Sequence, residues 1–237
     1  KYKISEEFEN ITPDPDEAVE SDSRLQNELD NLKDIQPHSV ITTNYDQFLD
    51  HLFSEYETVI GQEILRSEHQ NIGEIFKIHG CISKPDQLVL TQEDYDEFDK
   101  KKQYLSAKLL TFFAEHPLLI VGYSASDPNV IRILSDMERM LTDGEDLISN
   151  VYFIEWKESI DSSTDLQSEK VIPLPDGRSV RVNCITTNYF DWIFDTFGEG
   201  GELEGVKVKL LRKIAAHTYD VIRTDVPSKT VELERDI

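Results

Sequence analysis

Short β-branched runs alternate along the chain with longer stretches in which hydrophobic residues recur at helical spacing. The apolar runs at residues 39–42, 74–78, 118–122 and 151–154 predict buried strands. Helical spacing is found at 23–35 and again at 46–57, 91–115 and 128–141. Thr91 and Asp94 predict a capping box at the start of the helix at 91–115. This alternation predicts an α/β fold, with a Rossmann-like, mostly parallel sheet and helices on both faces.

The end of the first predicted strand carries an unusual group of polar residues. Thr43, Asn44 and Asp46 follow the β-branched run directly and precede the helix expected from residue 46. In open α/β sheets, ligands bind in the crevice outside the carboxyl ends of the strands. An amide, a hydroxyl and a carboxylate there can bond a polar ligand and hold a water. The same residue types also cap helices, so both interpretations remain open for this stretch.

Two later strands end in a similar way. The run at 75–78 stops at His79 and Gly80, and the run at 117–121 stops at Gly122, shortly before Ser124. Asp127 then suits the N-cap of the next helix, whose amino terminus attracts anions, although a plain capped turn explains it equally well. We expect Asn44, His79 and Ser124 to face one crevice, because all three follow predicted parallel strands.

The three strand ends read Thr-Thr-Asn-Tyr-Asp, Lys-Ile-His-Gly and Val-Gly-Tyr-Ser. In this order they resemble the sirtuin-like family, and more narrowly the sirtuin-like domains of bacterial antiphage defence systems, over roughly residues 36–200. The resemblance implies that NAD is the substrate and that it is cleaved to nicotinamide and ADP-ribose, which depletes NAD. It also implies a homo-oligomer or an assembly with a defence partner such as a HerA-type ATPase. The site residues then expected are Asn44, His79 and Asp46 for catalysis, with Thr43, Gly122, Ser124 and Asp127 against the nucleotide.

This reaction breaks a glycosidic bond to a positively charged leaving group through an oxocarbenium-like transition state. Asn44 would orient the attacking water or the ribose, and His79 would act as general base. Asp46 would bond the carboxamide or stabilise the developing positive charge.

Composition restricts the alternatives. The chain has 47 Asp and Glu residues and 24 Lys and Arg residues. The resulting net charge of −23 argues against general nucleic-acid binding. The run at 100–102 is the one short basic candidate, and we interpret it as a solvated helix face. The two cysteines cannot build the four-cysteine zinc module typical of protein-deacylating sirtuins, and they fit a reducing, cytoplasmic location. The histidines and cysteines show no metal-ligand spacing, so no metal is predicted.

We divide the chain into an acidic lead and helix at 1–37, a sirtuin-like domain at 38–200, and a C-terminal helix and tail at 201–237. Residues 1–22 are expected to be flexible or extended, and the basic amphipathic stretch at 206–222 is expected to form a closing helix or a partner-docking element. Residues 1–38 contain no glycine, so the Gly-rich turn that approaches NAD phosphates in this family is missing there. Either the chain is a fragment or that segment is absent. An inactive nucleotide sensor or assembly module is therefore an alternative function. A protein deacylase is disfavoured by the cysteine count, and a nuclease has no local signature.

A near-copy of the first motif occurs at Ile185–Tyr189. Phe190 stands where Asp46 stood in the first copy, so we do not predict a second site there. We expect Asn188 to be structural and to lie outside the crevice.

Overall fold

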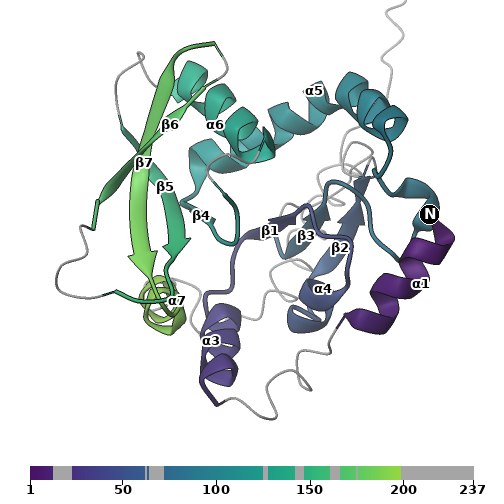
Figure 1. Ribbon diagram of the computed structural model, residues 1–237, viewed down its shortest axis with the longest axis horizontal. Coiled ribbons are helices and arrows are strands. Elements are labelled where there is room, and N and C mark those ends of the chain that lie inside the picture. The colour runs from purple at the N-terminus through teal and green to yellow at the C-terminus, as the bar shows by residue number, and fades with distance from the viewer. Residues whose placement is uncertain are drawn as a thin grey trace, which may run out of the picture. The chain divides into compact units, whose positions relative to one another are not determined.

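The computed structural model describes residues 1–12, 23–61, 63, 72–124, 128–141, 147–160, 166–174 and 176–198 (Figure 1). The described elements alternate helices and strands, which confirms the expected α/β, Rossmann-like fold. In chain order they are α1 (Tyr2–Ile11), α3 (Ser23–Asp34), β1 (Ser39–Thr42), α4 (Phe48–Leu52), β2 (Glu57–Ile60), β3 (Glu74–Lys77), η2 (Pro85–Gln87), α5 (Gln92–Glu115), β4 (Leu118–Ile120), α6 (Pro128–Leu141), β5 (Leu147–Trp156), β6 (Glu169–Pro173), β7 (Ser179–Thr187) and α7 (Asp191–Gly198).

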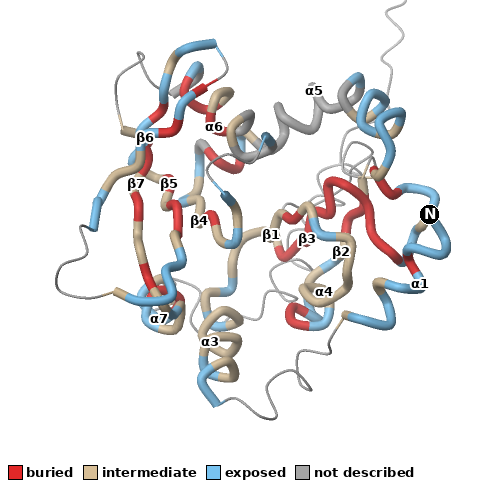
Figure 2. Tube along the Cα trace, in the orientation of Figure 1, coloured by how far each residue is buried: buried red, intermediate tan, exposed pale blue. Residues whose placement is uncertain are grey.

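The chain divides into two compact units, each with its own sheet. Unit 1 comprises Lys1–Leu88 and Phe194–Ile237, and unit 2 comprises Val89–Ile193. The sheet of unit 1 is parallel, with strand order β1-β3-β2. All four residues of its central strand β3 are buried, as the red segment in Figure 2 shows. Burial on both faces is typical of a central parallel strand and explains the apolar run around residue 76.

Two apolar clusters hold unit 1 together. Leu52, Phe53 and Ile75 form one cluster, against which Leu29 and Leu32 of α3 pack. The predicted helix at 23–35 is therefore confirmed, and its leucines are partly buried against the core. The other cluster contains Ile60, Cys81 and Ile82, with Phe8 and Tyr45 packed against it.

The first residues of the chain differ from the expected flexible lead. Tyr2–Ile11 forms helix α1, and the ring of Phe8 makes an edge contact with the ring of Tyr45, 6.0 Å between centroids. Lys1 Nζ also donates to the carbonyl of Leu88 at 2.6 Å. The acidic composition of this stretch obscured the contact that Phe8 makes within unit 1, so the prediction was wrong for residues 2–11.

The helix predicted at 46–57 is also shorter than expected. Helix α4 ends at Leu52, and strand β2 occupies 57–60, where no element was assigned. A turn closes between them, with the amide of Tyr56 donating to the carbonyl of Phe53 at 2.8 Å. The Tyr56 hydroxyl donates to the carbonyl of Pro37 at 2.6 Å, and burial raises the pKa of that hydroxyl. The turn at 53–56 therefore ends the helix before its predicted bound, and β2 begins where that prediction stopped.

Unit 2 contains a mixed sheet of order β4-β5-β7-β6, in which β6 is antiparallel to β7 and the other pairs are parallel. Strand β5 is longer than the predicted run at 151–154, because it begins at Leu147. The predicted capping box of α5 is present: Thr91 Oγ1 accepts from the Asp94 amide at 3.2 Å, and Asp94 Oδ2 accepts from the Thr91 amide at 2.9 Å.

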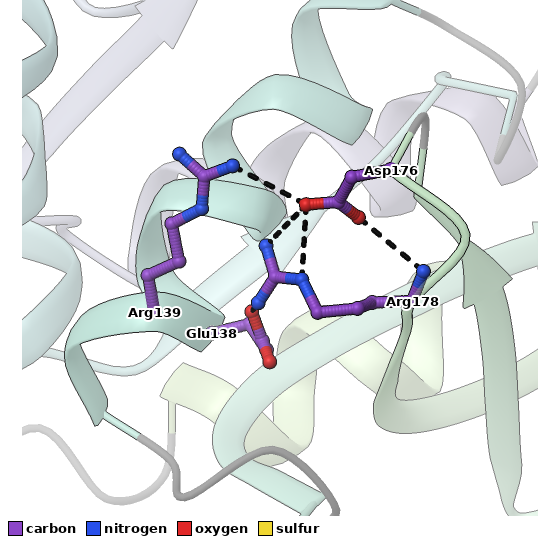
Figure 3. Close-up of polar contacts among 4 residues, drawn as sticks. All are labelled: Glu138, Arg139, Asp176 and Arg178. Atoms are coloured by element: carbon purple, nitrogen blue, oxygen red, sulfur yellow. Dashed lines mark hydrogen bonds and ion pairs between the residues drawn. The ribbon is translucent and has the colours of Figure 1, made fainter.

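The β6–β7 turn of unit 2 is tied to helix α6 by charged side chains (Figure 3). Arg178 donates to Asp176 Oδ2 through Nε at 2.9 Å and through Nη2 at 2.7 Å, and it also pairs with the buried carboxylate of Glu138. Arg139 reaches the same Asp176 oxygen at 3.3 Å. The hydrogen bonds from Arg178 are the main reason that the pKa of Asp176 falls to about 2.

None of the helices in the described ranges is long and apolar enough to cross a membrane. The basic amphipathic helix expected at 206–222 lies outside the described residues.

Candidate functional site

The first two predicted site residues follow neighbouring strands of unit 1. In the parallel pairing of β1 with β3, Thr42 is opposite Lys77, and Asn44 and His79 each come two residues later. The amide of Ile82 donates to the carbonyl of Tyr45 at 2.9 Å, which ties the loop after β3 to the loop after β1. The sheet therefore delivers Asn44 and His79 on adjacent, connected loops at one edge.

The loop after β1 is shaped by its own side chains. The hydroxyl of buried Thr42 accepts from the amide of Asn44 at 3.0 Å. Asp46 Oδ1 accepts from the amide of Phe48 at 3.0 Å, at the start of α4. Asp46 therefore supports the start of α4 from one residue before its N-cap, Gln47. Asn44 is exposed and Thr43 is half-buried. The arrangement presents the amide of Asn44 to solvent on a loop with fixed backbone.

His79 lies in a tight turn at the end of β3 and is only 3% exposed. The amide of Gly80 donates to the carbonyl of Lys77 at 3.3 Å, which closes the turn around His79. Gly80 has a φ of +98°, and a Cβ there would lie 2.6 Å from the carbonyl oxygen of Gln87. Glycine is required at this position, because both the backbone conformation and the close approach of the 87–88 segment exclude a side chain.

Beneath these loops lies a buried cation that the sequence analysis did not single out. Lys77 is the last residue of β3, and its side chain is 1% exposed. Its ammonium group donates to the main-chain carbonyl of Asp46 and pairs with Asp50 Oδ2 at 2.7 Å. Asp50 Oδ1 in turn accepts from the hydroxyl of Thr58 on β2 at 2.5 Å. The sequence carried a signal for this contact, because Lys77 lies at the end of an apolar run that predicts a buried strand. A lysine buried there needs hydrogen-bond and charge partners.

The predicted nucleotide-binding residues of unit 2 follow strand β4. Gly122 and Ser124 are both exposed, and Gly122 has a φ of +77° with nothing within 4 Å of a Cβ placed there. Glycine at 122 is therefore needed for the backbone conformation rather than for space. Asp127 lies outside the described residues. The convergence of this strand end with Asn44 and His79 stays a prediction.

The second Thr-Thr-Asn-Tyr motif lies in unit 2 and has a different local structure. Strand β7 continues to Thr187, the second threonine of its motif, whereas β1 ends at Thr42, the first threonine. Thr187 Oγ1 accepts from the amide of Tyr189 at 3.2 Å and from Trp192 Nε1 at 3.1 Å. Asn188 therefore follows its strand directly, one position earlier than Asn44.

Within the part of the chain that the structure describes, no group of three His, Cys, Asp or Glu side chains is arranged to hold a metal ion. Cys81 and Cys184 are both buried and carry free thiols.

Comparison with known proteins places these motifs in a family. A family model described as SIR2-like domain matches residues 38–173, which include the strand ends of β1, β3 and β4. Among curated relatives, Defense-associated sirtuin 2 of Bacillus subtilis is 28% identical over 120 residues, which are 48% of this chain and 12% of that protein.

Two proteins named NAD(+) hydrolase ThsA are also similar. The protein from Enterococcus faecium is 31% identical over 114 residues, covering 44% of this chain and 23% of that protein. The protein from Bacillus cereus (strain MSX-D12) is 26% identical over 103 residues, covering 41% of this chain and 22% of that protein. The chain thus spans less than a quarter of the length of these relatives. Because the family model matches more than half of the chain, the protein belongs to the SIR2-like domain family.

Proposed function

We propose that this chain is the catalytic domain of an NAD hydrolase, which cleaves NAD to nicotinamide and ADP-ribose in bacterial antiphage defence. The observation that carries the proposal is the parallel pairing of β1 and β3, which sets Asn44 and His79 on adjacent loops. The names of the relatives, NAD(+) hydrolase ThsA and Defense-associated sirtuin 2, support the substrate and the defence role.

The chemistry requires little acid catalysis. The nicotinamide ring is positively charged while it is bonded to the ribose of NAD, and it leaves as a neutral molecule when that bond breaks. The domain has to hold the ribose and place a water molecule next to it. As this water attacks the oxocarbenium-like carbon, the domain has to remove a proton from the water. The exposed amide of Asn44 suits the placing of a water or a ribose hydroxyl. His79 would accept the proton, provided that the substrate enters between the loops to reach this buried ring.

The remaining predicted residues take supporting roles in this proposal. Asp46 shapes the loop through Phe48 and adds a negative charge that favours the developing cation. Thr43 lies beside Asn44 and would contact the ribose. Gly122 and Ser124 would bind the ribose and phosphates, since an exposed glycine turn permits close backbone approach to an anion.

A second candidate is a module that binds NAD or ADP-ribose without cleaving it. The side chain of His79 is only 3% exposed, which favours this candidate. A general base has to lie within hydrogen-bonding distance of the water that it deprotonates, and a buried ring is poorly placed to reach that water.

Incubation of the purified chain with NAD separates the two candidates. Hydrolysis predicts that nicotinamide and ADP-ribose appear together in equal amounts by chromatography. Binding measured by calorimetry, with NAD recovered intact, would establish the sensor instead. An acyl-lysine peptide added with NAD is the control for deacylation, for which the product would be an acylated ADP-ribose.

A further inference from the structure

The buried side chain of Lys77 takes no part in the chemistry proposed above, yet it connects elements of unit 1 that surround Asn44 and His79. Its ammonium group contacts the loop after β1 through the carbonyl of Asp46 and helix α4 through the carboxylate of Asp50. Asp50 then reaches β2 through Thr58. A lysine ammonium has three donors and is costly to bury without partners, so its position is tightly determined by these acceptors.

The position of Lys77 in the chain links the two proposed catalytic residues. Lys77 precedes His79 by two residues in the same strand end, and the Gly80 amide closes the turn back onto the Lys77 carbonyl at 3.3 Å. The same residue therefore fixes the segment carrying His79 through its backbone and the loop carrying Asn44 through its side chain.

The loop that Lys77 contacts is also held by other contacts. They include the Asn44 amide to Thr42, the Phe48 amide to Asp46, and the Ile82 amide to the Tyr45 carbonyl, and the Tyr45 ring packs against Phe8. The first two are local to the loop and do not connect it to β3. The side chain of Lys77 is thus the charged connection between the β3 segment and the Asn44 loop.

We propose that Lys77 is a positioning residue, whose ammonium group holds the main-chain carbonyl of Asp46 and thereby sets the spacing between Asn44 and His79. The catalytic part of this inference rests on the proposed NAD hydrolysis, whereas the loop-holding part stands independently of it. A misplacement of about 1 Å in a catalytic constellation can cost on the order of 100-fold in rate, so the spacing matters.

The competing explanation is that Lys77 only forms a structural ion pair with Asp50. Two variants separate the explanations. Asp50→Asn removes the charge of the partner, and its amide can turn its oxygen toward Lys77 while its NH2 donates to the Thr58 hydroxyl, so the lysine keeps a neutral acceptor there and can still donate to Asp46. The double variant Lys77→Met with Asp50→Asn also removes the donor, and it leaves no unpaired buried carboxylate. The exposed pair of Lys84 with Glu63, at 2.5 Å, offers Lys84→Met as the control for loss of a lysine.

Two readouts are measured on the same full chain: backbone hydrogen exchange of residues 44–48, and the kcat and KM of nicotinamide release. We expect Asp50→Asn and Lys84→Met to retain loop protection and turnover. We expect the double variant to lose protection at the Asn44 and Phe48 amides and to lose on the order of 100-fold in kcat, with KM little changed.

Unchanged loop protection in the double variant would overturn the proposal. Equal losses in Asp50→Asn and the double variant would also overturn it, because the ion pair alone would then explain both. If the unaltered chain releases no nicotinamide, the proposed function fails, and hydrogen exchange still decides whether Lys77 holds the loop.

Discussion

His79 and Asn44 occupy different environments, one buried in a tight turn and one exposed on a loop, yet they end two paired strands. Replacing His79 by Ala should lower nicotinamide release by about 10²–10⁴-fold, which is the usual contribution of general acid–base assistance. Asn44→Ala should lower it comparably through lost positioning. Asn188→Ala, on the second motif, should change turnover little. Rates are to be compared for variants with matched thermal unfolding.

Normal turnover by His79→Ala would contradict the proposed mechanism. A much lower unfolding temperature for that variant would instead indicate that the buried ring is structural, and Asn44→Ala would then carry the test alone.

Gly80 is the residue whose backbone conformation the turn around His79 depends on. Gly80→Ala should lower the free energy of unfolding by more than the roughly 1–3 kcal/mol of a strained backbone, because its Cβ would also lie 2.6 Å from the Gln87 carbonyl. Gly61→Ala is the control in the same unit, with a φ of +53° and only an ordinary contact at 3.5 Å. Denaturant unfolding of both variants measures the difference, and equal losses would contradict the close approach.

At the scale of elements, the charged turn between β6 and β7 should make stability depend on pH. The pKa of Asp176 is about 2 in the folded state against an ordinary value of 3.8. A carboxyl with a lowered folded pKa stabilises the fold above its unfolded pKa, and this contribution disappears as pH falls through the folded value. The Asp176 contribution should therefore be complete above about pH 4 and lost by about pH 2.

The measurement is the difference in unfolding free energy between the unaltered chain and Asp176→Asn across that range of pH. The difference should shrink as pH falls, since the protonated carboxyl no longer pairs with Arg178. Arg139→Met is the control for loss of a charged side chain at this turn. It leaves both guanidinium hydrogen bonds from Arg178 to Asp176 in place, so most of the pH dependence should remain. A difference that is constant with pH would contradict the assignment.

For the molecule as a whole, the net charge of −23 should oppose the compact state through self-repulsion. Added NaCl screens charges beyond about 10 Å at 0.1 M, so the unfolding temperature should rise between low and moderate salt. Scanning calorimetry over a series of NaCl concentrations measures this effect. A fall in unfolding temperature would mean that attractive pairs such as Arg178 with Glu138 outweigh the repulsion.

Local patterns by themselves determined much of the fold and part of the candidate site. The positions of strands β1, β3 and β4 follow from apolar runs, although only β3 is buried along its whole length, and the start of α5 follows from its capping box. Asn44, His79 and Gly122 were chosen as candidates because each stands at or just beyond the end of an apolar run. These features are encoded within a few residues, so neighbouring positions suffice to predict them.

Tertiary structure decided the features whose partners are distant in the sequence. Helix α1 packs through Phe8 against Tyr45, and β2 forms a strand that pairs in parallel with β3. The strands also divide into two sheets, which no local pattern indicates. Lys77 shows the reason most clearly: an ammonium can be buried at the end of β3 only because Asp46 and Asp50, some thirty residues away in the sequence, fold back to accept its hydrogens and balance its charge.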